Sequence, residues 1–211
     1  MMNAPTAAGR LKPGVFGSPT LIHRLISIIE PLDFEKLFRD SRPVEVELGS
    51  GDGSFLVAYA SRHRDRNFLG VERLLGRLRK IDRKALRADL INLRLVSIEA
   101  SYLLKYLVPR ESVTALHVYF PDPWPKRKHR KNRLINEAFA GLARQILVPG
   151  GTVYLRTDDP DYFAQMTTVF AANPGFFLTP TPPDLSAIIT DFEQDFLTKR
   201  ITILRGAYQR R

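Results

Sequence analysis

The sequence predicts an α/β fold, in which a mostly parallel sheet is covered on both faces by helices. Five short apolar segments alternate with segments whose apolar residues recur at helical spacing, a pattern typical of parallel sheets. The first apolar segment runs directly into a glycine-rich loop, as expected where a strand turns into a helix. We predict strands at 44–48, 67–72, 93–99, 115–120 and 152–157.

Helices are predicted between these strands, and one more precedes the first strand. Residues 21–29 carry apolar side chains at helical spacing and predict this leading helix. The segments 176–179 and 201–208 have no clear full-length helix between them, so we expect two antiparallel strands that close the sheet. The remaining helices are predicted at 54–63, 73–88, 101–107, 133–147 and 161–173.

The length and composition indicate one soluble globular domain. A chain of 211 residues can form one full core, so we expect a single domain over 21–211 after a flexible N-terminal arm at 1–20. No apolar run approaches the roughly 18–20 residues of a membrane span, and the N-terminus lacks the hydrophobic core of a signal peptide. The chain has no cysteine and only four scattered histidines, which argues against disulfides and metal sites. We therefore expect a cytoplasmic protein without a metal.

The charge balance favours a polyanionic partner. The formal net charge is +10, although a basic protein that merely stays soluble would share that value. The cations are clustered: residues 126–133 hold six Lys or Arg and no acid, and residues 73–87 hold seven against the single acid Asp82. Release of counterions from a phosphate backbone rewards such clusters, which indicates binding to nucleic acid.

The loop after the first strand predicts a nucleotide-like cofactor. Residues 47–53 read Glu-Leu-Gly-Ser-Gly-Asp-Gly, and Gly49 and Gly51 allow the backbone to approach a ligand closely. The spacing is G-x-G-x-G, which differs from the G-x-G-x-x-G of dinucleotide folds. Glu47, directly before the loop, suits a cationic ligand such as S-adenosylmethionine better than a pyrophosphate. A glycine turn with surface acids is the alternative.

Two acids at the ends of the next strands extend this prediction. Glu72 follows Gly49 by 23 residues and ends the second strand, where a carboxylate can accept hydrogen bonds from both ribose hydroxyls. Glu99 ends the third predicted strand, where it would meet an adenine edge or remain a solvated acid.

The turn after the fourth strand joins a carboxylate, an indole and the basic segment. Residues 119–125 read Tyr-Phe-Pro-Asp-Pro-Trp-Pro, and the prolines restrict the backbone around Asp122 and Trp124. Such a turn can hold a planar base beside a polyanion that is bound by residues 126–133. Trp124 would either stack on a splayed base or pack in the core.

With these pieces in order, the chain resembles the tRNA (guanine-N7-)-methyltransferase family of class I S-adenosylmethionine-dependent enzymes. The resemblance covers roughly residues 40–205. It implies a Rossmann-like, seven-stranded, mostly parallel sheet with a reversed last strand and helices on both faces. Its carriers are ELGSGDG (47–53), GVE (70–72), FPDPWPKRKHRKNRL (120–134), LVPGGTVYLRTDD (147–159) and TDFE (190–193).

Position by position, the resemblance implies roles for individual residues. The cofactor would contact Glu47, Gly49, Gly51, Glu72, Glu99 and Asp122. The guanosine region would contact Lys126, Asp158, Thr190, Asp191, Phe192 and Glu193. The family usually has Asp or Asn where Glu99 stands, and Trp-Glu where this chain has Asp159-Pro160.

The activity implied is methyl transfer to N7 of a variable-loop guanosine in tRNA, by a monomer or homodimer. Guanine N7 carries no proton at neutral pH, so the reaction needs positioning rather than a general base, and Asp122 is the predicted catalytic residue. One alternative is an amino-group methyltransferase of the N6-adenine type, although its loop needs a second Pro where Trp124 stands. The other is a non-catalytic RNA-binding module.

Overall fold

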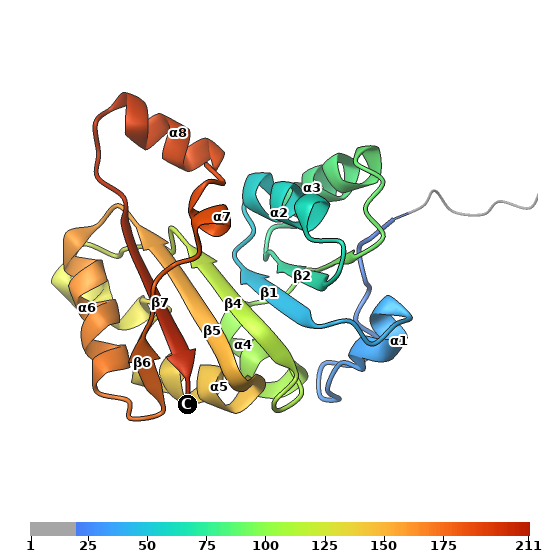
Figure 1. Cartoon of the computed structure of the whole chain (residues 1–211), viewed down its shortest axis with the longest axis horizontal. Coiled ribbons are helices and arrows are strands. Elements are labelled where there is room, and N and C mark those ends of the chain that lie inside the picture. Colours follow the sequence, from blue (N-terminus) through green and yellow to red (C-terminus); the bar gives the residue numbers. More distant parts are fainter. Residues whose placement is uncertain (1–19) are drawn as a thin grey trace, which may run out of the picture.

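A seven-stranded sheet forms the centre of the molecule (Figure 1). The structure is a computed structural model and describes residues 20–211. The strand order is β3-β2-β1-β4-β5-β7-β6, and every neighbouring pair is parallel except those of β7, which runs antiparallel to β5 and β6. The predicted fold with its reversed last strand is thereby confirmed. The strands are β1 (Val44–Leu48), β2 (Asn67–Val71), β3 (Leu93–Val96), β4 (Val113–Tyr119), β5 (Leu147–Thr157), β6 (Phe176–Leu178) and β7 (Leu204–Arg210).

The helices connect the strands largely as predicted. α5 begins at Glu137 and not at 133, because the Asn136 side chain caps it by accepting from the Phe139 N–H at 3.0 Å. The segment predicted at 101–107 starts as α4 and continues as the π-helical turn η1. The helices are α1 (Phe34–Phe38), α2 (Ser54–Arg62), α3 (Leu75–Arg87), α4 (Ala100–Tyr102), η1 (Leu103–Leu107), the 3-10 helix η2 (Arg127–Asn132), α5 (Glu137–Ile146), α6 (Pro160–Ala171), α7 (Pro183–Ser186) and α8 (Asp191–Thr198).

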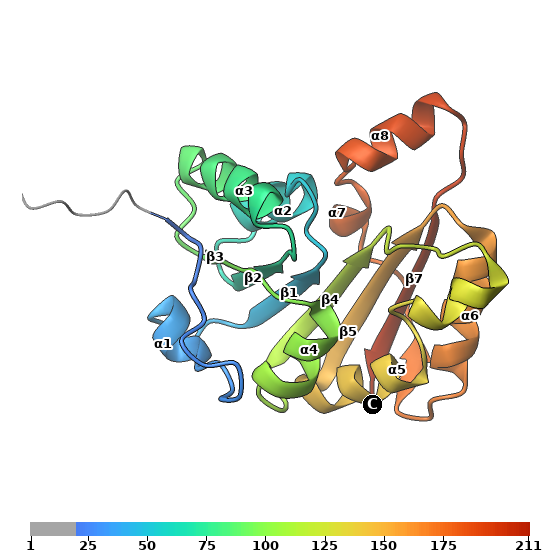
Figure 2. The same ribbon diagram turned by 180° about the vertical axis from the view of Figure 1, so that it is seen from behind.

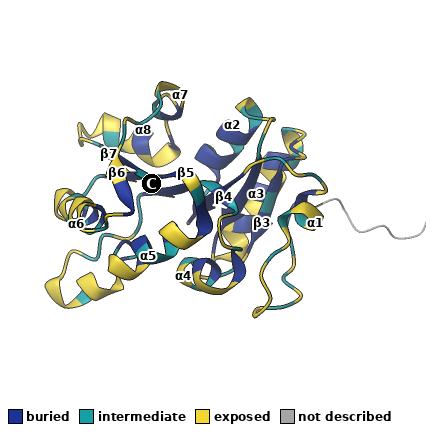
Figure 3. Ribbon diagram, turned by 60° about the horizontal axis from the view of Figure 1, so that its bottom comes forward, coloured by how far each residue is buried: buried dark blue, intermediate teal, exposed yellow. Residues whose placement is uncertain are grey.

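Alternation along the central strands divides the core into two layers. Val46 and Leu48 of β1 pack in the cluster formed with η1, α5 and α6. Glu45 and Glu47 alternate with them and therefore point to the other face, which α2, α3 and α7 cover. Figures 1 and 2 show these two helical layers from opposite sides of the sheet, and Figure 3 shows the buried strands between exposed helix faces.

The face under α2 and α7 carries a buried stripe of polar side chains, which we call the polar stripe: Glu45, Glu47, His117, Tyr119 and Arg156. His117 Nε2 lies 2.7 Å from a carboxylate oxygen of Glu45, and His117 Nδ1 lies 2.8 Å from the Tyr119 hydroxyl. Burial raises the pKa of Glu45, but the hydrogen bonds and charges of His117 and Arg66 together outweigh it and lower that pKa. Each stripe residue is less than one-tenth exposed, so polar pairing replaces apolar packing there.

The predicted helix at 21–29 is wrong. Ile22 forms a bridge to Leu95 of β3, with hydrogen bonds from His23 N to Leu95 O at 2.7 Å and from Leu95 N to Leu21 O at 3.0 Å. This segment therefore adds a short pairing to the free edge of the sheet. Ile26 beyond it is 98% exposed, so helical spacing there does not create a buried face.

Three further expectations need correction or lie outside the described residues. The third strand ends at Val96, not at 99. Of the two closing strands, only β7 is reversed, because β6 pairs antiparallel with β7 and thus runs parallel to β5. The predicted flexible arm falls on residues 1–19, which lie outside the described range, whereas Thr20 donates to Asp82 at 3.0 Å. Among residues 20–211, no helix combines the length and apolarity needed to cross a bilayer.

Candidate active site

The glycine loop and the Pro-Asp-Pro-Trp turn lie side by side at one edge of the sheet. β1 and β4 are adjacent and parallel, with Leu48 opposite Val118. The loop that follows Leu48 and the turn that follows Tyr119 therefore leave the sheet at the same edge (Figure 1). This edge is where open α/β sheets bind their ligands.

The glycine loop has a backbone that suits glycine alone. Gly49 has φ of 77°, and an added Cβ would find no atom within 4 Å, so the loop faces open space there. Gly53 also has φ of 77°, and a Cβ there would lie 2.8 Å from Ile81 Cγ1. The loop can therefore present its backbone to a ligand while α2 packs closely on α3.

Glu47 is a buried carboxylate with an unsatisfied oxygen. Its side chain is 5% exposed, and Oε2 has no hydrogen-bond partner among the described residues. Burial raises the pKa of Glu47 from 4.5 to about 8, with Asp52 and Glu72 adding to the effect and Arg156 opposing it. A cationic or hydroxyl-bearing ligand would satisfy this oxygen, so the donor set fits the predicted cofactor.

The raised pKa of Glu47 predicts that the free energy of unfolding falls as the pH rises. Because the folded-state pKa is raised, the protonated carboxyl is favourable below pH 4.5, and this contribution is lost as the pH rises through 8. Glu47→Gln should therefore melt at nearly the wild-type temperature at pH 5 and well above it at pH 8.5. The gain in the free energy of unfolding at the higher pH is as much as about 5 kcal/mol. Thermal unfolding of the ligand-free protein across this range measures it, with the surface variant Glu137→Gln as control, and parallel melting curves would contradict it.

Glu72 ties the second strand to the glycine loop. Its Oε2 accepts from the Gly51 N–H at 3.1 Å, and Oε1 accepts from the Leu74 N–H at 2.8 Å. The carboxylate is 6% exposed, so these backbone donors fix its position at the edge of the site. Each oxygen retains a lone pair for a further donor.

Glu99 is placed differently from the prediction. It follows the end of β3 by three residues and caps α4, accepting from the Ser101 and Tyr102 N–H groups at 3.0 and 2.8 Å. The side chain is exposed. Helix capping therefore accounts for both carboxylate oxygens, and either could still accept from a ligand.

The Pro-Asp-Pro-Trp turn is held open to solvent by its backbone. Phe120 and Trp124 adopt left-handed φ values of 51° and 45°, which turn the chain sharply on both sides of Asp122. Asp122 is exposed, and the indole of Trp124 is half-buried with its ring edge-to-face with His129 at 5.8 Å. Trp124 belongs to neither core cluster.

Arg133, at the end of the basic segment, anchors this turn. Its Nε donates to the Pro123 carbonyl at 2.7 Å, and its Nη atoms donate to Gln165 and Asp161 at 2.8 and 2.7 Å. The side chain is 2% exposed. The expectation that the whole segment 126–133 contacts phosphates is therefore wrong for Arg133, because its guanidinium is used inside the protein.

The other basic side chains of this segment face solvent. Lys126, Arg127, Lys128, Arg130 and Lys131 are exposed on and beside η2. Among them, Arg130 forms an ion pair with Asp161 at 3.0 Å. A cationic surface thus begins directly after the turn that carries Asp122.

The segment from Thr190 to Glu193 starts α8 and reaches the glycine-loop helix. Thr190 and Glu193 form a capping box, with Thr190 Oγ1 accepting from the Glu193 N–H at 3.1 Å and Glu193 Oε2 accepting from the Thr190 N–H at 3.0 Å. The Asp191 N–H donates to Ser54 Oγ of α2 at 3.3 Å. The nearby carboxylate of Asp52 raises the pKa of Asp191. The structure therefore brings this segment next to the glycine loop.

The side chains of that segment differ in exposure. Asp191 and Phe192 are exposed, and Phe192 is 51% accessible. Glu193 is 1% exposed, with Arg156 and Arg205 on its two oxygens at 2.8 Å each. Both oxygens of Glu193 are thus bonded to arginines inside the protein, whereas Asp191 and Phe192 face solvent.

Asp158 lies at the end of β5, half-buried beside the start of α6. The next residue, Asp159, caps α6 by accepting from the Tyr162 N–H at 2.7 Å, and Pro160 is the first helical residue. This pair therefore begins a helix in the ordinary way, with an Asp cap and a proline in the first turn. Asp159 and Pro160, which stand where the family usually has Trp-Glu, thus have a local role in starting α6.

Two buried arginines were missed by reasoning from the sequence. Arg133 stood unnoticed within a run of exposed cations, and Arg156 lies in a strand that reads as apolar. A signal was available for Arg156, because a charge at an inward strand position requires partners. Nothing local marks Arg133.

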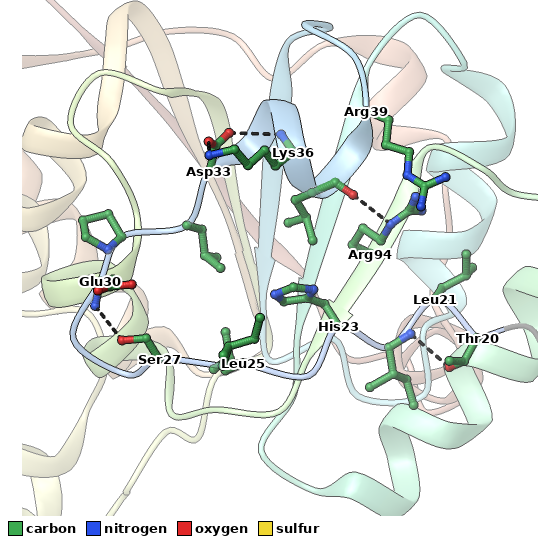
Figure 4. Close-up of a pocket in the computed structure, with 15 residues that line it drawn as sticks. Thr20, Leu21, His23, Leu25, Ser27, Glu30, Asp33, Lys36, Arg39 and Arg94 are labelled. Carbon is green, nitrogen blue, oxygen red and sulfur yellow. Dashed lines mark hydrogen bonds and ion pairs between the residues drawn. The ribbon is translucent and has the colours of Figure 1, made fainter. Parts of the chain in front are cut away.

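A pocket of about 620 Å³ lies away from this edge, where residues 20–33 and α1 pass beside β3 (Figure 4). His23, Lys36, Arg39 and Arg94 line it together with aliphatic side chains, most of them half-buried. None of the predicted site residues lines it. The chemistry of the glycine loop and the Asp122 turn is therefore separate from this pocket.

Comparison with known proteins agrees with the fold and the motifs. A family model described as "Putative methyltransferase" matches residues 41–205. A tRNA (guanine-N(7)-)-methyltransferase of Syntrophotalea carbinolica is 36% identical over 67% of this chain, and the chain spans 61% of that relative's length. The enzyme of the same name from Geobacillus thermodenitrificans is 32% identical, with 82% of each chain covered.

A similar solved structure is that of the 16S rRNA methyltransferase KamB, with a TM-score of 0.62 and 17% identity. The alignment covers 84% of this chain and 92% of that one. At this identity the similarity shows the fold alone, which is that of class I methyltransferases. Because the family model covers most of the chain and the relatives agree, this protein belongs to the tRNA (guanine-N7-)-methyltransferase family of S-adenosylmethionine-dependent enzymes.

Proposed function

We propose that this protein transfers the methyl group of S-adenosylmethionine to N7 of a guanosine in tRNA. The observation that carries the proposal is the position of the Asp122 turn beside the glycine loop, at the ends of adjacent parallel strands. The curated relatives named for this reaction support the choice of RNA and of base.

In this proposal the cofactor occupies the edge formed by β1, β2 and β4. Glu47 binds its cationic groups, which satisfies the unpaired Oε2. Glu72 accepts from the ribose hydroxyls, Glu99 lies toward the adenine, and the backbone at Gly49 and Gly51 passes close to the ligand. When bound, the cofactor supplies an electrophilic methyl group on a sulfonium.

The protein's share of the reaction is positioning and electrostatics. N7 has an in-plane lone pair and no proton to remove, so no residue needs to act as a general base. Asp122 touches the reacting groups, orients the base by accepting from its N–H groups, and stabilises the positive charge that develops on the purine. The open turn, fixed by Arg133, keeps this carboxylate in place at little ordering cost.

The guanosine region is proposed to contact Lys126, Asp158, Thr190, Asp191 and Phe192. Lys126 directly precedes η2, Asp158 directly follows β5, and Thr190 caps α8, which begins with Asp191 and Phe192. Phe192 and Trp124 offer aromatic surface for a splayed base, where stacking contributes about 1–3 kcal/mol. Glu193 is the exception, because its carboxylate is used inside the protein.

Two cationic surfaces flank the site and are proposed to bind the tRNA backbone. The first is the exposed part of the basic segment on η2. The second is the solvent face of α3, which lies beside the glycine loop because Lys84 pairs with Asp52 at 2.7 Å. Both supply affinity without sequence choice, as phosphate contacts do.

The test is methyl transfer to an unmodified tRNA transcript, with the product nucleoside identified by mass spectrometry. We expect N7-methylguanosine, and no transfer to a transcript made with 7-deazaguanosine, which has a carbon in place of N7. Methylation of that control transcript, or N6-methyladenosine as product, would support the amino-group alternative. Binding of tRNA without binding of S-adenosylmethionine would support the non-catalytic alternative.

A further inference from the structure

The chain between β6 and β7 forms an excursion that covers the end of the sheet at the site. It comprises α7 and α8, and both views place it above the ends of β4 and β5 (Figures 1 and 2). α7 is joined to the core by Leu185 and Ile188, which are buried in the cluster with α2. α8 has an exposed outer face, so contacts on its inner side must fix its position.

Arg156 of β5 is the main connection between this excursion and the sheet. Its Nη2 donates to the Leu185 carbonyl at 2.5 Å, and its Nη1 donates to the Ile188 carbonyl and to Glu193, each at 2.8 Å. The side chain is 1% exposed. One guanidinium thereby binds α7, the link after it, and α8 together.

Glu193 completes the connection from the α8 side. One oxygen accepts from Arg156 and from the Thr190 N–H, and the other accepts from Arg205 of β7 at 2.8 Å. With 1% exposure, this carboxylate has lost its water and depends on these donors. Both oxygens are therefore held by arginines that connect α8 to β5 and β7.

The same arginine also touches the strand that leads to Asp122. Its guanidinium lies 4.3 Å from the centre of the Tyr119 ring, and its carbonyl accepts from the Phe120 N–H at 2.8 Å. The Phe120 ring packs against Phe196 and Phe192 of α8, with centroids 5.4 and 6.3 Å apart. The pair Arg156–Glu193 and the aromatic contact therefore join α8 to the residue two positions before Asp122.

We propose that Arg156 and Glu193 are positioning residues that hold α8 against Phe120 and so fix the orientation of the Asp122 turn. This inference rests on the proposed function for its catalytic meaning. Glu193 then acts through the protein and does not bind the guanosine. Without the pair, the Asp122 carboxylate would be held less precisely. A misplacement of about 1 Å can lower a rate on the order of 10²-fold.

The test uses the single tryptophan of the chain, Trp124, as a reporter within the turn. Glu193→Gln keeps the shape of the side chain, and Arg156→Met removes the guanidinium. In the free protein, both should increase the quenching of Trp124 fluorescence by acrylamide. At saturating tRNA, both should lower kcat about 10²-fold with little change in the KM for tRNA. The double variant should be no worse than Arg156→Met alone, because the residues act as one unit.

A matched control is Arg210→Met, which removes another largely buried arginine of the same sheet. Arg210 donates to the Leu147 carbonyl and pairs with Glu111, far from α8 and the turn. It should lower the melting temperature but leave Trp124 quenching and kcat unchanged. If Arg156→Met does not fold, Glu193→Gln decides alone.

The proposal is overturned if Glu193→Gln raises the KM for tRNA while Trp124 quenching and kcat stay at the wild-type level. That result would make Glu193 a guanosine ligand. Additive losses in the double variant would also contradict it. The fluorescence is measured without tRNA or cofactor, so it tests the positioning role even if the wild-type protein transfers no methyl group to tRNA and the proposed function fails.

Discussion

Asp122→Ala is expected to lower kcat for methyl transfer by about 10²–10³-fold, the usual loss when one preorganised charge is removed from a transition state. Affinity for tRNA should change little, because we propose that the phosphate contacts lie on η2 and α3 and not in the turn. Single-turnover rates with saturating cofactor and tRNA measure the effect, together with tRNA binding by filter retention. Near-normal turnover would remove Asp122 from the catalytic role.

Asp122→Asn separates charge from hydrogen bonding. Asn retains an acceptor of the same shape, so a rate close to that of Asp122→Ala would assign the effect to the negative charge. A rate close to wild type would assign it to the orientation of the base. Asp65→Asn is the matched control, since this exposed carboxylate lies between α2 and β2 and, within residues 20–211, forms an ion pair with Arg66 alone, at 3.3 Å.

Replacing Arg127, Lys128 and Lys131 with glutamine should weaken tRNA binding by about 10²-fold at physiological salt. The reason is counterion release, since three lost phosphate contacts reduce the slope of log K against log salt by about 2–3. These residues are preferred to Arg130, which already pairs with Asp161. Titrations at several salt concentrations give both the affinity and the slope, and kcat at saturating tRNA should stay close to wild type.

An equal removal of charge from α3, by replacing Arg79, Lys80 and Arg83 with glutamine, tests the second proposed surface and shows how the RNA is divided between the two. These side chains are exposed and do not adjoin the Asp122 turn. If the α3 variant alone lowers the salt slope, the tRNA backbone lies mainly on that helix. If both variants lower it by similar amounts, the RNA spans the two surfaces.

The order of strands and helices could be predicted because the spacing of apolar residues within most elements marks the element as a strand or a helix. The alternation in Val-Glu-Val-Glu-Leu (44–48) marks a strand whatever its surroundings, and the glycine loop marks the turn that follows. The helix predicted at 21–29 was wrong because the free edge of β3 offers unpaired backbone groups, and Ile22 pairs with Leu95 there. That edge exists only once the whole sheet is formed, so no local window contains it.

The position of the acids and glycines at one end of the sheet could be predicted, but the buried residues that support them could not. Glu47 is the penultimate residue of β1, and Glu72 and Asp122 follow the ends of β2 and β4. Parallel topology alone brings these strand ends together. Arg133 and Glu193 look like their exposed neighbours in the sequence. Their burial depends on Asp161 and Gln165 in one case and on Arg156 and Arg205 in the other, all of them distant in the chain or separated by a turn.

The side chains on the two faces of the sheet should tolerate substitution to different extents. In the layer under α5 and α6, Tyr162 packs on Arg133 and so supports the Asp122 turn. The aliphatic residues of that layer can be exchanged for others of similar volume with a cost mainly in stability. The polar stripe joins Glu45 and His117 to Tyr119 and Arg156, and through them to the Asp122 turn. A more thermostable variant of this protein should therefore be built by substituting aliphatic residues of the first layer.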